Sequence, residues 1–152
     1  MTLKEFLNIT YISKDDYFRM NKDIQKFDSL YFYRYPRIYC KDGFNISVQG
    51  GHGLYSTPDK KSKIYENLEI GFPKMNDDFY EDEIMNGNTD VRGYVSIQEI
   101  QDCFDRHGGI DEDKTFENIS TKRIGFSEFF FRKNHPYIRR KKIEKITGLK
   151  FY

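Results

Sequence analysis

The stretch that most constrains the fold is RIYCKDGFNISVQGGHGLYSTP, residues 37–58. Apolar and polar residues alternate on both sides of residues 41–43, which is typical of two half-buried strands joined by a turn. A two-residue Asp-Gly loop would put the apolar faces of the two strands on opposite sides. A three-residue loop with its glycine left-handed instead pairs Ile38 with Ile46. Because strand register follows the apolar face, we predict the three-residue loop.

The predicted hairpin runs into a loop with almost no side chains, which consists of Gly50, Gly51, His52 and Gly53. Successive backbone N–H groups in such a loop can bind an anion, and Lys60 follows within the same segment. The loop lacks the Gly-Lys-Ser/Thr ending of a phosphate-binding P-loop. Its two interpretations are therefore an anion-binding loop and a flexible turn.

Capping signals and apolar stripes with a helical period predict helices over residues 3–7, 13–27, 96–107, 127–132 and 136–147. The best defined is the helix that begins at Ser96, which forms a capping box with Glu99. This helix is expected to end at Gly108 in a left-handed cap. The stretch that follows, residues 111–121, is polar and is expected to be a loop.

Two further strands are predicted over residues 65–72, ending at Pro73, and over residues 91–95. The acidic segment 76–83 between them is expected on the surface with a helical turn. The elements together predict an α+β fold with a small, largely antiparallel sheet of about four strands built on the central hairpin. The helices over residues 17–27 and 96–107 are expected to cover one face of this sheet.

Length and composition set few limits on function. The chain has 152 residues, which predicts a single domain, with residues 36–110 as its core and residues 111–152 as a basic helical extension. The net charge of +1 gives no overall electrostatic signal. Two cysteines, Cys40 and Cys103, favour a reduced cytoplasmic setting over a disulfide framework. No stretch has the length of a membrane span, and we expect no signal peptide.

Charge is segregated at the C-terminus. Residues 125–152 carry eight basic and two acidic residues, a net charge of +6, so the remainder carries −5. On a helix that starts at Pro136, the side chains that point together are those of Arg140, Lys141 and Lys145. One interpretation is a docked helix whose basic face is solvated or neutralises the acidic segment 77–83. The other is that this basic face binds phosphates or an acidic partner surface.

Metal binding and thiol catalysis have only partial support. Residues 88–99 match part of a calcium-binding loop, but Arg92 stands where a ligand oxygen is required. Cys103 and His107 lie one helical turn apart and could both reach a metal, although two ligands do not make a zinc site and core packing is favoured. Cys40 and His52 could form a catalytic cysteine–histidine pair, but nothing local activates the thiol. We therefore predict no cofactor, no metal and no catalytic residue.

The segments RIYCKDGFNISVQ, YSTP, LEIGFP and GYVSIQEIQDCFDRHGGI, in this order and spacing, resemble a group of small uncharacterised proteins encoded by tailed bacteriophages. The match covers about residues 36–110, roughly half of the chain, and the chain departs from the group's pattern in the loop at residues 50–53. The resemblance implies a phage or prophage origin and an accessory gene, and it carries no activity or catalytic residues.

On this basis we expect a non-enzymatic accessory protein in the cytoplasm of the bacterial host. It would bind a host protein or a protein–nucleic acid complex and inhibit a bacterial defence system, with direct nucleic-acid contact through the basic C-terminal arm as an option. The alternative is a phage enzyme of nucleotide or nucleic-acid metabolism that uses the loop at residues 50–53, and a calcium-binding helix-loop-helix protein is a lesser alternative. An enzyme requires polar groups converging in a pocket at that loop, whereas a binding protein requires an exposed aromatic or charged patch.

Overall fold

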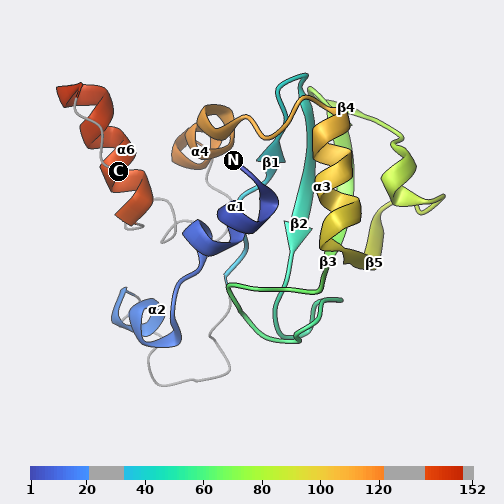
Figure 1. Cartoon of the computed structure of the whole chain (residues 1–152), viewed down its shortest axis with the longest axis horizontal. Helices are drawn as coiled ribbons and strands as arrows, with labels where there is room; N and C mark the ends of the chain where they lie inside the picture. Colours follow the sequence, from blue (N-terminus) through green and yellow to red (C-terminus); the bar gives the residue numbers. More distant parts are fainter. Residues whose placement is uncertain (21–32, 122–135, 149–152) are drawn as a thin grey trace.

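The computed structural model describes residues 1–20, 33–121 and 136–148, and it has the predicted α+β fold with an antiparallel sheet (Figure 1). The strands are β1 (Ile38–Tyr39), β2 (Phe44–Gln49), β3 (Asn67–Met75), β4 (Asp78–Phe79) and β5 (Val91–Ser96). The helices are α1 (Leu3–Thr10), α2 (Lys14–Met20), the 3-10 turn η3 (Glu83–Met85), α3 (Ile97–Arg106), α4 (Glu112–Thr121) and α6 (Pro136–Thr147).

The sheet has the strand order β1-β2-β3-β4, and β5 also pairs with β3. Because β2 occupies one edge of β3, β4 and β5 share the other edge, with β4 at the end of β3 and β5 along its first half. The described residues thus form five strands in a sheet four strands wide. In the acidic segment 76–83, β4 pairs back onto β3, and the expected helical turn begins only at the segment's last residue, where η3 starts at Glu83.

The central hairpin has the predicted register. Ile38 lies opposite Ile46, and the Cys40 N–H donates to the Phe44 carbonyl at 2.7 Å. Gly43 has φ of +99°, and its N–H donates to the Cys40 carbonyl at 3.0 Å. The three-residue loop is confirmed, and it keeps the apolar residues of both strands on the same face.

The sequence predicted that this strand ends at Pro73, but β3 continues to Met75. The ladder between β2 and β3 shifts register between Asn45 and Ser47, opposite this proline. A bulge leaves a position without a ladder hydrogen bond, so a residue with no N–H is tolerated there. Phe72, which precedes the proline, has φ of 53° at the same irregularity.

Helix α3 has the predicted cap residues at both ends, but the Glu99 carboxylate accepts from Arg92 and does not complete the capping box. The Ser96 hydroxyl accepts a hydrogen bond from the Glu99 N–H at 3.1 Å. At the other end, the Gly109 N–H donates to the Phe104 carbonyl at 2.7 Å, and the Gly108 N–H donates to the Asp105 carbonyl at 3.2 Å. This pair of bonds is a Schellman motif, and Gly108 supplies the left-handed residue that it needs, with φ of +86°.

The helix beside α3 on the sheet is α1 (Figure 1). The Leu3 N–H donates to the Gln101 side chain at 2.8 Å, and Phe6 and Leu7 are buried in the core. From the sequence, we expected the helix over residues 17–27 at this position. The described part of that helix, α2, instead places Tyr17 against Tyr33, with ring centroids 6.0 Å apart; residues 21–27 lie outside the described residues.

Residues 112–121 form helix α4, so the loop expected there is wrong. The Asp111 carboxylate accepts from the Lys114 N–H at 2.9 Å, which caps the helix. Thr115 is buried and its hydroxyl accepts from the Tyr39 N–H of β1 at 3.0 Å, while the Phe116 ring packs on the α1 side. The segment contains too few apolar residues for a stripe, and tertiary contacts fix the helix instead.

The last helix, α6, has the predicted limits. It begins at Pro136 and ends before Gly148, whose N–H donates to the Glu144 carbonyl at 2.8 Å. The short helix predicted over residues 127–132 lies outside the described residues.

The side chain of Phe104 is fully buried between α3 and the sheet. Phe104→Ala removes buried apolar surface and leaves a cavity, so it should lower the free energy of unfolding by about 3–5 kcal/mol. Ser96→Ala should cost about 1 kcal/mol through the lost cap. Denaturant unfolding measures both, with Gln98→Ala on the exposed side of α3 as the control. Equal losses for Phe104→Ala and Gln98→Ala would contradict this core assignment.

Candidate functional site

In the glycine loop after β2, backbone N–H groups donate to side chains that follow the loop in the sequence. The Gly51 N–H donates to the Ser56 hydroxyl at 3.1 Å, and the Gly53 N–H donates to the Asp59 carboxylate at 3.0 Å. His52 is exposed, with its ring nitrogen 3.7 Å from the same carboxylate. An anion at this loop would have to displace Asp59, so these contacts do not favour the anion-binding interpretation.

Close packing explains why the loop begins with glycine. A Cβ atom on Gly50 would lie 2.6 Å from side-chain carbons of both Leu68 and Tyr65. The Gly50 carbonyl accepts a hydrogen bond from the Lys61 ammonium at 2.7 Å. Lys60, which we predicted to lie near a bound anion, is exposed. The lysine that contacts the loop is Lys61.

Lys61 is 7% exposed, which the sequence analysis does not anticipate for a basic turn. Its Nζ lies 4.1 Å from the ring centroid of Tyr35 and 4.4 Å from that of Tyr33. Burial, assisted by the charge of Arg34, lowers the pKa of Lys61 to about 7. Two aromatic faces and one carbonyl therefore enclose this amine, and its contacts tie the loop to the segment before β1.

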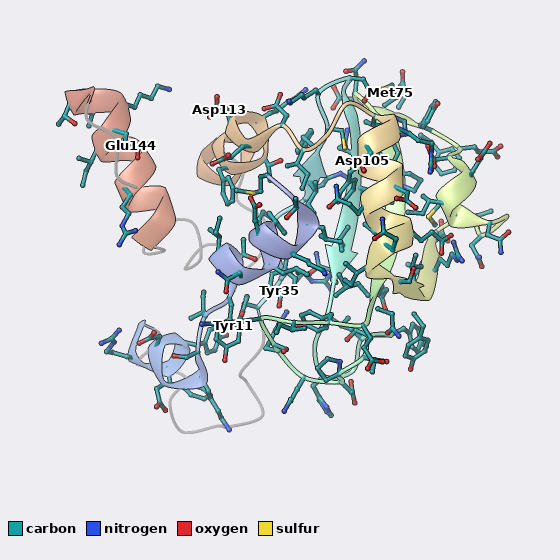
Figure 2. All side chains as sticks on the ribbon, in the orientation of Figure 1. Tyr11, Tyr35, Met75, Asp105, Asp113 and Glu144 are labelled. Carbon is teal, nitrogen blue, oxygen red and sulfur yellow. The ribbon has the colours of Figure 1, made fainter. Side chains whose placement is uncertain are left out.

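That segment is itself fixed to the sheet through a buried glutamine. The Tyr35 N–H donates to Gln49 Oε1 at 2.9 Å, and Gln49 Nε2 donates back to the Tyr35 carbonyl at 3.0 Å. The hydroxyl groups of Tyr35 and Tyr65 lie 3.0 Å apart. In Figure 2, Tyr35 is labelled below α1. The region around the loop is therefore packed with the protein's own groups.

A second polar cluster lies at the C-terminal end of α3. His107 is 7% exposed; its Nδ1 lies 2.6 Å from the Asp42 carboxylate and its Nε2 lies 2.7 Å from the Asp82 carboxylate. Its ring stacks on Phe44 with a centroid distance of 4.0 Å and an interplanar angle of 10°. Both nitrogens of this buried ring thus have partners, as buried polar groups require.

The Asp82 carboxylate accepts hydrogen bonds from several donors in this cluster. Burial alone would raise the pKa of Asp82, but hydrogen bonds from the Ile84 N–H, from His107 and from Arg106 outweigh it, so the pKa is lowered. Cys103 Sγ lies 3.8 Å from the same carboxylate. Burial and the charge of Asp82 raise the pKa of Cys103, which keeps this thiol protonated. Sequence reasoning missed Asp82 because it lies in the acidic segment, 21 residues before Cys103.

The two other chemical hypotheses find no matching geometry. Cys40 lies beside the start of β2 and His52 lies beyond its end, roughly 20 Å apart at about 3.4 Å per residue. Burial raises the pKa of the Cys40 thiol to about 12. In the proposed calcium loop, residues 91–96 form strand β5, and Arg92 Nη1 donates to the Glu99 carboxylate at 2.6 Å.

Exposed aromatic side chains lie on and beside the β3–β5 side of the sheet. Tyr55 and Tyr94 are 56% and 59% exposed, with ring centroids 5.8 Å apart. Tyr94 and the exposed Phe72 both have positive φ, at 54° and 53°. Bulky residues rarely adopt this conformation, and such backbone strain is more frequent at functional surfaces than elsewhere.

Helix α6 presents both charge and apolar surface. Arg140 and Lys145 are exposed, and Lys141 lies on the same helix. Ile143 and Ile146 are 45% and 84% exposed, so this side is not buried against the described residues. Figures 1 and 2 show α6, on which Glu144 is labelled, apart from the sheet and from the acidic segment that follows β3. The structure does not show the docked, charge-neutralised helix that the sequence analysis considers.

Comparisons with protein-family models, with curated proteins and with solved structures gave no match for this chain. Among the described residues, no helix combines the length and the apolar character that a membrane crossing needs.

The buried amine predicts a pH dependence of stability. The pKa of Lys61 is 10.5 in its ordinary state and about 7 in the folded protein, so between these values the unfolded chain binds more protons. The free energy of unfolding should therefore rise from pH 7 to pH 10 by more in the wild type than in Lys61→Met. The control is Lys60→Met, which should behave like the wild type. Denaturant titrations at several pH values measure the differences, and equal slopes for all three proteins would contradict the buried amine.

Proposed function

We propose that this protein is a non-enzymatic binding protein whose helix α6 docks onto an acidic surface of a partner protein. The observation that supports this most is the exposure of Ile143 and Ile146 on a helix that also carries Arg140, Lys141 and Lys145. Apolar side chains that are this exposed are in contact with water, and burying them against a partner surface is favourable. The glycine loop, in contrast, uses its backbone donors internally.

A protein partner fits α6 better than nucleic acid alone. Phosphate groups can pair with the basic residues, but they bury no isoleucine. A helix that fits a groove uses apolar anchors three or four residues apart, which is the spacing of Ile143 and Ile146, with charged residues at the rim. Burying an isoleucine fully is worth about 1.5–3 kcal/mol, which is comparable to several rim charges.

The biological setting of the proposal rests on the resemblance to phage accessory proteins. That resemblance supports a host protein, or the protein part of a protein–nucleic acid complex, as the partner in the bacterial cytoplasm. Small accessory phage genes often act against host defence, so inhibition of a defence system is the role we propose.

The test is a binding measurement with a purified partner. The immobilised protein is used to isolate partners from a bacterial lysate, which mass spectrometry identifies, and the purified partner is then titrated against variants. Arg140→Gln, Lys141→Gln and Lys145→Gln together should weaken binding by roughly tenfold or more at low salt, and by less at physiological salt. Ile146→Ser should weaken it at both salt concentrations, because apolar burial is not screened.

A matched control removes three exposed lysines elsewhere, with Lys4, Lys60 and Lys74 changed to Gln. This variant has the same change of charge and should bind like the wild type. Loss of binding in the control but not in the α6 variants would place the contact on the main body and overturn the proposal. Loss on changing Tyr55 and Tyr94 to Ser, with the α6 variants unaffected, would also overturn it and would place the contact at β5.

A further inference from the structure

The cluster at the end of α3 contains more metal-binding groups than the sequence analysis could assemble. Cys103 and His107 are one helical turn apart, and the fold adds Asp82 from the cap of η3. One ligand atom from each of these residues lies within 4.8 Å of the other two. We propose that Asp82, Cys103 and His107 form a binding site for a divalent transition metal, with zinc as the best chemical match.

The donor set has the chemistry that zinc prefers. Zinc binds thiolate sulfur, imidazole nitrogen and carboxylate oxygen, usually in a tetrahedral arrangement. The Asp82 oxygen atoms lie 3.8 Å from Cys103 Sγ and 2.7 Å from His107 Nε2. The bond lengths of tetrahedral zinc place a sulfur and an oxygen ligand about 3.5 Å apart and a nitrogen and an oxygen ligand about 3.3 Å apart. The Cys103–Asp82 separation is close to the first value, and the hydrogen bond between His107 and Asp82 would have to lengthen by about 0.6 Å to reach the second. Three protein ligands leave a fourth position for water.

Asp42 has the place of an outer partner in this site. Its carboxylate lies 2.6 Å from His107 Nδ1, the ring nitrogen that faces away from Asp82. A carboxylate there accepts a hydrogen bond from Nδ1–H, so the proton stays on Nδ1 and the Nε2 lone pair can bind a metal. Metal-binding histidines in proteins nearly always have such a second contact, which fixes the tautomer and the ring orientation. In the sequence, nothing connects Asp42 with residue 107.

The charges around the cluster also favour a cation. Asp42 and Asp82 are both acidic, and His107 lies at the C-terminus of α3, where the helix dipole is negative. The Arg106 guanidinium donates to Asp82 at 3.0 Å, and its side chain is 46% exposed, so it can move toward solvent. On binding, the Cys103 S–H bond breaks, its proton leaves to water and a metal–sulfur bond forms. The Nε2 proton that His107 donates to Asp82 likewise leaves to water, and a metal–nitrogen bond forms in its place.

The test uses cobalt(II) as a spectroscopic substitute for zinc. Titration of the metal-free, reduced wild-type protein with Co²⁺ should give a thiolate-to-cobalt charge-transfer band in the near ultraviolet and the visible bands of a tetrahedral ion. Equimolar Zn²⁺ should abolish both. Cys103→Ser should lose the charge-transfer band. Cys40→Ser is the matched control, because it changes the other buried cysteine, and it should retain the band.

Zinc should also raise the unfolding temperature of the wild type and of Cys40→Ser, because a ligand bound only by the folded state stabilises it. The same addition should have a much smaller effect on Cys103→Ser and on Asp82→Asn. Circular dichroism checks that each variant is folded before titration. A folded wild type with no charge-transfer band and no zinc-dependent stabilisation would overturn the proposal. A band that persists in Cys103→Ser would overturn it as well.

Discussion

His107 contacts two carboxylates and thereby joins three segments of the structure. Burying an imidazole ring is unfavourable unless both nitrogens find partners, and here the partners come from segments far apart in the sequence. Asp42 belongs to the turn of the central hairpin, and its carboxylate also accepts from the Phe44 N–H at 2.9 Å. Asp82 belongs to the cap of η3. One side chain at the end of α3 thus holds a hairpin turn and a surface segment together.

Backbone hydrogen bonds reinforce this junction. The Asp42 N–H donates to the His107 carbonyl at 3.3 Å, and the Lys41 N–H donates to the Gly109 carbonyl at 3.0 Å. The carbonyls at a helix C-terminus lack partners within the helix, and the hairpin turn supplies donors to some of them. The Schellman motif and the hairpin loop, each predictable alone, therefore stabilise one another. The sequence shows both motifs, but their meeting depends on how α3 packs across the sheet.

Local signals account for what the sequence could predict. Capping residues, turn glycines and strand alternation identified the hairpin, α3 and α6, because each is determined by neighbouring residues. The features that sequence reasoning missed depend on distant contacts. Lys61 is buried because aromatic rings from the segment before β1 enclose it, and α4 is a helix because Asp111 caps it and Phe116 packs on α1. The aspartate at residue 82 joined the histidine cluster for the same reason.

The glycine loop and helix α6 differ in how far the rest of the described protein covers them. Glycines at residues 50–53 suggested a ligand loop, yet their surroundings are filled by Lys61, Ser56 and Asp59. Helix α6 has the opposite character, with isoleucines that the described residues leave exposed. A surface that remains unsatisfied after folding is where a partner gains most. For this reason we propose that helix α6, and not the glycine loop, binds the partner.

Hydrogen–deuterium exchange of the free protein and of its complex with the isolated partner distinguishes binding through α6 from binding through the glycine loop. We expect slower exchange over residues 136–147 in the complex, because binding buries α6, with no change over residues 50–60. Protection over residues 50–60 without any over residues 136–147 would contradict it.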